Sequence, residues 1–213
     1  MPGIKLPERA TVEVVPLTVD EVRALTESVP ERMRAMVTVG VGLGLRQGEC
    51  FGLTVDRVDF LRRTVRVDRQ LQEGGLVPPK TSASVRSIPA ADVVLEALAE
   101  HLATFGEGPD GLIFATERGR PWRRSGFSDQ WRRARADAGV RDDVTYHDLR
   151  HFYASALIHA GASVKAVQAN LGHATAGETL DTYGHLWPDD EDVTRRAIGA
   201  VLGGDRAASA RSV

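Results

Sequence analysis

The 213-residue sequence is poor in the features that build disulfide frameworks and membrane spans. Its only cysteine is Cys50, which excludes an internal disulfide and fits a reducing compartment. No apolar run approaches the about 20 residues that a membrane helix needs, and no signal peptide opens the chain. We therefore expect no membrane partner.

The sequence also lacks an excess of positive charge, because 27 lysines and arginines face 29 aspartates and glutamates. Taken alone, this balance argues against a DNA-binding domain, since such domains are usually basic. Charge is local, however, and the arginines are concentrated in two runs, which are either solvated faces or part of a DNA-binding surface. The two runs are Arg62, Arg63, Arg66 and Arg69, and Arg123, Arg124, Arg132, Arg133 and Arg135.

The length and the apolar fraction of 42% suit one globular domain with tails. Capping signals and apolar periodicity predict helices along most of the chain, and β-branched stretches predict one small sheet. Strands are predicted over 58–60, 64–71 and 84–88, and helices from Thr18 and Pro30, over 47–53, 91–102, 125–138 and 147–160, after Ser163 and Thr175, and over 193–202. The expected fold class is α+β, mostly helical, with a three-stranded antiparallel sheet. We expect a tail or linker over 1–15, a domain over 16–188, and a helix with a flexible tail over 189–213.

The stretch from Tyr146 to His185 carries the most distinctive chemistry. His147 and Arg150 lie one helical turn apart, His173 follows a helix end, and Tyr183 lies on the next short helix. Donors that converge on a hydroxyl suit attack on a phosphodiester, because negative charge develops on the phosphate oxygens. Tyrosine has a free pKa of about 10, so it needs a neighbour that takes its proton.

These residues resemble the second half of the catalytic signature of the tyrosine recombinases, the phage-integrase family. The first half is matched upstream, where 42–49 resembles the first arginine motif and 79–89 resembles the lysine hairpin. The residues around Tyr183 are similar to those of integrases from actinobacterial phages. The motifs are Gly42-Leu43-Gly44-Leu45-Arg46-Gln47-Gly48-Glu49, Pro79-Lys80-Thr81, Val85-Arg86-Ser87-Ile88-Pro89, His147-Asp148-Leu149-Arg150, Leu171-Gly172-His173 and Leu180-Asp181-Thr182-Tyr183-Gly184-His185-Leu186.

The resemblance implies DNA transesterification without a metal or any other cofactor. The implied site residues are Arg46, Lys80, His147, Arg150, His173 and Tyr183. The tyrosine would form a 3′-phosphotyrosyl link, while the two arginines hold the non-bridging oxygens and the lysine protonates the leaving 5′-oxygen. His147 would exchange the tyrosine's proton, and His173 would donate a hydrogen bond to the phosphate. The acidic run 189–192 is a poor metal site, because its members are consecutive and no motif histidine accompanies them.

Several neighbours of the motifs receive structural roles instead. Glu49 either orients Arg46 or caps the helix that follows it, and the resemblance favours a structural role. His151 and His159 are predicted to be packed or exposed rather than catalytic. Both tryptophans near the second arginine run, Trp122 and Trp131, are predicted to lie in the core rather than to stack on bases.

The resemblance also implies partners. They are double-stranded DNA at attachment sites, three further subunits in a tetramer on DNA, and accessory DNA-bending proteins, all in the cytoplasm of a bacterial host. Members of the family exchange C-terminal segments, and 193–202 carries an apolar stripe that suits such an exchange. They usually carry a smaller DNA-clamping domain before this point, so we expect the chain to correspond to the catalytic domain over 16–188.

Two other functions compete with site-specific recombination in phage integration and excision. The first is a type IB topoisomerase, which shares the nucleophile, although its lysine and histidine contexts resemble this sequence less. The second is a DNA-binding or assembly module without catalysis, against which the retention of all the implied active-site residues argues. Covalent capture of a suicide DNA substrate would separate this module from both enzymes.

Overall fold

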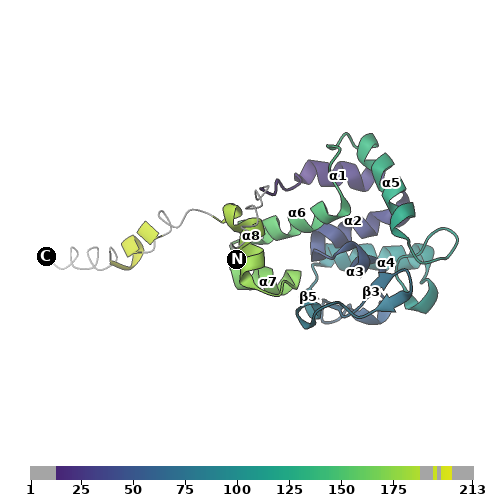
Figure 1. The fold of residues 1–213 in the computed structure, drawn as a ribbon, viewed down its shortest axis with the longest axis horizontal. Coiled ribbons are helices and arrows are strands. Elements are labelled where there is room, and N and C mark those ends of the chain that lie inside the picture. Colours follow the sequence, from purple (N-terminus) through teal and green to yellow (C-terminus); the bar gives the residue numbers. More distant parts are fainter. Residues whose placement is uncertain (1–12, 188–193, 196–197, 203–213) are drawn as a thin grey trace, which may run out of the picture.

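The computed structural model describes residues 13–187, 194–195 and 198–202 (Figure 1). Its helices are α1 (Val19–Ser28), α2 (Glu31–Leu43), α3 (Gln47–Phe51), α4 (Asp92–Phe105), α5 (Arg124–Asp137), α6 (Tyr146–His159), α7 (Val164–Leu171) and α8 (Ala176–Tyr183). Its strands are β1 (Val58–Asp59), β2 (Thr64–Val67), β3 (Gln70–Gln72), β4 (Gly75–Val77) and β5 (Arg86–Pro89). The α+β class, mostly helical with a small antiparallel sheet, is confirmed.

The helix ends follow their capping residues. The Thr18 hydroxyl accepts from the Glu21 amide while the Glu21 carboxylate accepts from the Thr18 amide, as the capping box predicts. Gly42 lies inside α2, and Gly44 ends it with a left-handed φ of 61°. α6 begins at Tyr146, one residue before its predicted start.

The core is built around α2 and α6, which pack directly against each other. Gly40 permits this close approach, because a Cβ atom there would lie 2.6 Å from Leu149 Cδ1. α6 also packs against α7, so it is buried on more than one face, and Ala154 and Ile158 are buried as well as Leu149. Ala156, on the opposite side of the same helix from Ala154 and Ile158, is exposed.

The three-stranded sheet is antiparallel in the order β1-β2-β5. Val65 lies opposite Ile88, and both side chains are fully buried beneath the sheet. The predicted strand over 64–71 was too long, because it breaks at Asp68, whose carboxylate accepts from Arg57, Arg66 and Arg69.

Past that break the chain forms an additional hairpin, β3–β4, which the sequence patterns did not predict. β3 packs against α3 at Gly52, where a Cβ atom would lie 2.7 Å from the Leu71 amide nitrogen. The third strand of the main sheet starts at Arg86 instead of Ser84, since Ser82–Ser84 forms a 3₁₀ turn.

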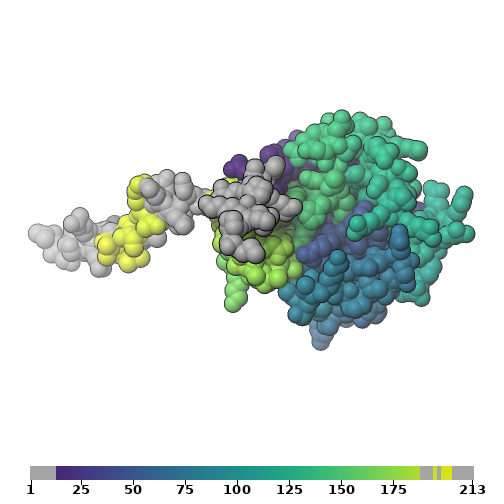
Figure 2. Space-filling view, in the orientation of Figure 1, coloured from purple at the N-terminus to yellow at the C-terminus, as the bar shows by residue number. Residues whose placement is uncertain are grey.

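Trp122 and Trp131 are buried, which confirms their prediction as core residues. Within the described ranges, no helix has both the length and the apolar character to cross a bilayer. Residues 1–12 of the predicted tail 1–15, the predicted tail 203–213 and part of the predicted helix 193–202 lie outside the described residues. The described residues 198–202 of that helix are helical and lie apart from the body of the domain, in yellow (Figures 1 and 2).

Candidate active site

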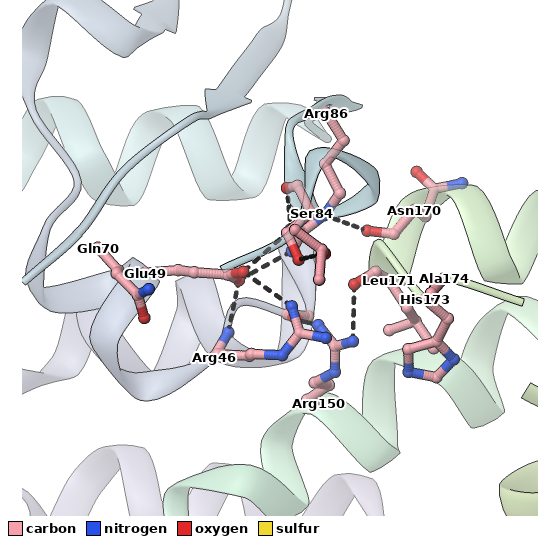
Figure 3. Close-up of polar contacts among 12 residues, drawn as sticks. Arg46, Glu49, Gln70, Ser84, Arg86, Arg150, Asn170, Leu171, His173 and Ala174 are labelled. Carbon is pink, nitrogen blue, oxygen red and sulfur yellow. Dashed lines mark hydrogen bonds and ion pairs between the residues drawn. The ribbon is translucent and has the colours of Figure 1, made fainter. Parts of the chain in front are cut away.

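Two arginines from separate elements meet in the middle of the domain. Arg46 is the N-cap residue of α3, and Arg150 lies in the second turn of α6. Figure 3 shows their guanidinium groups side by side. Arg46 is partly open to solvent, with 36% of its side chain exposed, whereas Arg150 is 1% exposed. The pair therefore presents one buried and one accessible cation to the same region.

Arg150 is held by main-chain oxygens alone. Its Nη1 donates to the Gly44 carbonyl and its Nη2 to the Leu171 carbonyl, each at 2.7 Å. Burial, followed by the charge of Arg46, lowers the pKa of Arg150 from 12.5 to about 9, so the group remains protonated at neutral pH. Among the described residues no carboxylate forms an ion pair with it. A buried cation without a direct counter-ion favours the binding of an anion.

Glu49 orients Arg46 and also caps α3. Its Oε2 accepts from the Arg46 amide at 2.9 Å, and its Oε1 accepts from Arg46 Nη1 at 3.0 Å. The two roles that the sequence left open are therefore combined in one carboxylate. Burial alone would raise the pKa of Glu49, but hydrogen bonds and charge from Arg86, then from Arg46, lower it overall.

Arg86, which sequence reasoning did not single out, completes this network (Figure 3). Its Nη2 and Nη1 donate to the two carboxylate oxygens of Glu49, and its Nε donates to the Asn170 carbonyl at 2.7 Å. A signal for it exists in the strand pattern. Arg86 and Ile88 are two residues apart in β5, so both side chains point to the buried face.

The C-terminus of α7 binds both Arg86 and Arg150. Asn170 and Leu171 offer successive unpaired carbonyls, which Arg86 and Arg150 satisfy. Gly172 then turns the chain with a φ of +67°, and a Cβ atom there would lie 3.0 Å from Arg86 Nη1. The predicted helix end is confirmed, and it delivers His173 to the site.

His173 is buried beside the tyrosine. Its Nδ1 lies 2.9 Å from the Thr179 hydroxyl, and its ring stacks on that of Tyr183 with centroids 6.4 Å apart. Burial, followed by the charge of Arg150, lowers the pKa of His173 to about 4. The imidazole is therefore neutral near pH 7, so it can donate one hydrogen bond without carrying charge.

Tyr183 ends α8 and is 1% exposed. Thr175 caps the start of α8 by accepting from the Glu178 amide, while the Glu178 carboxylate accepts from the Ala174 amide. Burial raises the pKa of Tyr183 to about 12, although Arg150 and Arg46 oppose this shift. The phenol therefore requires help to lose its proton.

The hydroxyl of Tyr183 is held by a histidine that the sequence placed outside the site. It lies 2.8 Å from His151 Nδ1. His147 lies one turn away, with its ring edge toward the His151 ring at 4.7 Å between centroids. Loss of hydration, with the charges of His151 and Arg150, lowers the pKa of His147, and its exposed ring limits the size of this shift.

Lys80 is the one predicted site residue that stands apart. It is exposed in the segment between β4 and the Ser82–Ser84 turn, and no residue in the described chain forms a hydrogen bond or ion pair with it. The other five predicted residues are close enough that Arg46 and Arg150 shift the pKa values of their neighbours. Within the described ranges no cluster of three or more His, Cys, Asp or Glu side chains could hold a metal ion.

Comparisons with known proteins agree with this arrangement. Residues 16–189 match the family model described as the phage integrase family. A phiRv2 prophage integrase of Mycobacterium tuberculosis is 30% identical, covering 81% of this chain and 48% of its own length. The tyrosine recombinase XerD of Mycobacterium leprae is 34% identical, covering 84% of this chain and 57% of its own length.

A solved structure shares the fold as well. The Tn1549 transposon integrase, in complex with transposon right end DNA, superposes with a TM-score of 0.75 at 25% identity, covering 92% of this chain and 68% of that one. The chain spans about half the length of the curated relatives it matches. The match over 16–189, with the motifs assembled around Tyr183, shows that the chain belongs to the phage integrase family, the tyrosine recombinases.

Proposed function

We propose that the chain carries out site-specific DNA recombination for phage integration and excision, with residues 16–188 as its catalytic domain. Tyr183 Oη attacks a DNA phosphorus atom, the bond from phosphorus to the 5′-oxygen breaks, and a 3′-phosphotyrosyl link remains. The 5′-hydroxyl of a second strand reverses the step, so the reaction consumes no nucleotide and needs no metal. The prophage integrase and XerD relatives support this proposal.

The observation that carries the proposal is that Arg150 and Arg46 lie near enough to Tyr183 to act on its pKa. Both arginines act electrostatically on the tyrosine, and the buried one has no direct carboxylate partner in the described chain. A phosphodiester bound there would place its non-bridging oxygens against two guanidinium groups. Tyr183 would then face the phosphorus atom that those oxygens surround.

The remaining roles follow from position. His173 is neutral and buried, so it donates a hydrogen bond to the phosphate. Lys80 lies on an exposed segment, from which a long side chain can reach a bound strand and protonate the leaving 5′-oxygen. Lys80 forms no hydrogen bond or ion pair within the described chain, which fits a group that joins the site only with DNA.

The second arginine run supplies a surface for the DNA backbone. Four of its arginines are exposed around α5, and two more precede them: the six are Arg118, Arg120, Arg123, Arg124, Arg132 and Arg133. Among them only Arg132 forms an ion pair, with Asp129, so the others are free for phosphate within the described structure. Binding should weaken steeply with salt, because each neutralised phosphate releases counter-ions.

We propose assembly of four subunits on two DNA sites in the bacterial cytoplasm, helped by DNA-bending proteins. The described residues of the C-terminal helix support an exchange between subunits, since Ile198, Val201 and Leu202 are exposed. Such an apolar stripe needs a partner surface. Deletion from Val193 onward should impair synapsis more than binding to a single site.

The test is covalent capture. The chain is incubated with nicked suicide duplexes carrying candidate attachment sites, and a protein–DNA adduct is sought on a denaturing gel. Tyr183→Phe should bind the same DNA and form no adduct. An adduct in Tyr183→Phe would assign the nucleophile elsewhere, although Tyr146 and Tyr153 already bond to the Met36 carbonyl and the Asn170 side chain. Relaxation of supercoiled plasmid by a single subunit would favour topoisomerase activity instead.

A further inference from the structure

The contact between His151 and Tyr183 has no role in the mechanism above. His151 lies on α6 and Tyr183 on α8, 32 positions further along the chain, so the contact joins the two helices. The ring centroids lie 5.5 Å apart. The oxygen involved is the atom that would attack DNA. A hydrogen bond of 2.8 Å to a nucleophile's oxygen is the geometry expected of a general base.

His147 is less well placed for that task. It lies on the same face of α6 one turn before His151, so its ring meets the His151 ring rather than the phenol. Within the described structure, Tyr183 forms no hydrogen bond with His147. The exposed ring of His147 is instead free to meet a ligand that enters from solvent.

The protonation states of the pair suit a proton transfer. Burial, followed by Arg150, lowers the pKa of His151, and the nearby carboxylate of Asp148 only partly opposes this. The ring is therefore neutral near pH 7, while Tyr183 remains a protonated phenol. A neutral imidazole accepts at one nitrogen only, so the phenol can donate to Nδ1 when the ring proton is on Nε2.

We propose that His151 is a catalytic residue that holds the Tyr183 hydroxyl at Nδ1 and takes its proton during strand cleavage. This inference rests on the proposed function. As the bond from Tyr183 Oη to phosphorus forms, the phenolic proton moves to His151 Nδ1. The bond from phosphorus to the 5′-oxygen breaks at the same time, and the 5′-oxygen takes a proton from Lys80. In the reverse step the 5′-hydroxyl attacks and gives its proton back to Lys80, the phosphotyrosyl bond breaks, and His151 returns the proton to the tyrosine.

Charged and titratable groups surround both His151 and Tyr183. From α6, Asp148, Arg150 and His147 face His151, and from α8, Tyr183 faces it. Arg46 and Glu178 also act on the tyrosine. The two arginines favour the phenolate that forms, and Asp148 favours the imidazolium. Asp148 and Glu178 oppose the phenolate, and Arg150 opposes the imidazolium, so the proton moves only as the Tyr183 oxygen bonds to phosphorus.

A first experiment needs no DNA. Nitrogen-15 NMR of the free chain should show Nδ1 of His151 without a proton, and its resonance should move in Tyr183→Phe. A proton on Nδ1 would overturn the proposal, because His151 would then donate to the tyrosine instead of accepting from it.

A second experiment uses single-turnover cleavage of the nicked suicide duplex that the unmutated chain captures. His151→Asn keeps an amide near the position of Nδ1 but cannot take a proton. It should cleave about 10²–10⁴-fold more slowly at unchanged DNA affinity. His147→Asn is the matched control, with the same change one turn away.

The pH profile separates the two histidines. The unmutated chain should lose activity at a pH below 6.5, the ordinary pKa of imidazole, because burial lowers the pKa of His151 and the base becomes protonated only there. His151→Asn should lose this acid limb, and His147→Asn should keep it. The opposite pattern would overturn the proposal while leaving the recombinase function intact. Failure of the unmutated chain to form any adduct would overturn both.

Discussion

Arg86 and Glu49 form a two-point ion pair in the interior, with Nη2 to Oε2 at 2.9 Å and Nη1 to Oε1 at 3.1 Å. Their side chains are only 5% and 4% exposed. The pair ties β5 to α3, and the same carboxylate orients Arg46. Arg86, which lies outside the six predicted site residues, thus helps to fix the carboxylate that orients Arg46.

Breaking this pair should cost far more than breaking a surface pair. Arg86→Met leaves the Glu49 charge buried, and we expect unfolding free energy to fall by about 3–5 kcal/mol. Arg23→Met is the matched control, because the pair of Arg23 with Asp20 is exposed, and it should cost about 0–1 kcal/mol. Urea denaturation of both variants measures the difference. Equal losses would show that the buried pair contributes no more than a surface one.

His173 should make stability depend on pH. Its pKa is about 4 in the folded chain, whereas the ordinary value of 6.5 applies to the unfolded chain, so the unfolded chain binds more protons between these two values. Stability should therefore decrease as the pH falls from 6.5 to 4, by up to about 1.4 kcal/mol per pH unit from this residue. His173→Asn, whose amide can still meet Thr179, should show a shallower slope in denaturation series across this range. An unchanged slope would show that His173 does not contribute to the pH dependence of stability.

Gly172 should tolerate alanine less well than another left-handed glycine. Gly172 and Gly139 have φ values of +67° and +65°, so alanine imposes a similar backbone strain at both, about 1–2 kcal/mol. A Cβ atom at Gly139 meets nothing within 4 Å, whereas at Gly172 it presses on Arg86. Gly172→Ala should therefore cost about 1–3 kcal/mol more than Gly139→Ala. Thermal unfolding compares them, and equal destabilisation would mean that Arg86 moves aside freely.

Lys80 can be tested through the leaving group. Lys80→Ala should slow cleavage by about 10²–10⁴-fold, because an alkoxide leaves poorly without a proton. Sulfur at the bridging 5′-position leaves as a stable thiolate, so the variant should then cleave nearly as fast as the unmutated chain. Arg46→Ala, which loses a contact to the non-bridging oxygens, should show no such rescue. Equal defects of Lys80→Ala on both substrates would assign the general acid to another residue.

The sequence predicted what depends on nearby residues. The capping residues Thr18 and Ser163 and the left-handed turn at Gly172 are local signals, and the structure confirms all three. The mutual approach of Arg46 and Arg150 was implied by motif resemblance, and the structure brings them together.

The features that were missed depend on contacts between distant parts of the chain. Arg86 meets Glu49 across 37 positions and the Asn170 carbonyl across 84. His151 meets Tyr183 across 32 positions, and only the packing of α8 on the domain reveals that contact. The hairpin β3–β4 likewise forms where the chain packs against α3. No local period or cap encodes these pairings.

Because Arg150 is bound by two main-chain carbonyls, its position depends on the backbone rather than on neighbouring side chains. Every amino acid supplies a carbonyl, so the socket contributed by Gly44 and Leu171 is independent of side-chain chemistry. What the socket requires is the path of the chain, which at position 44 needs a residue that accepts a left-handed turn. The receptor for the central arginine is therefore set by backbone shape, and a substitution that keeps this path should keep Arg150 in place.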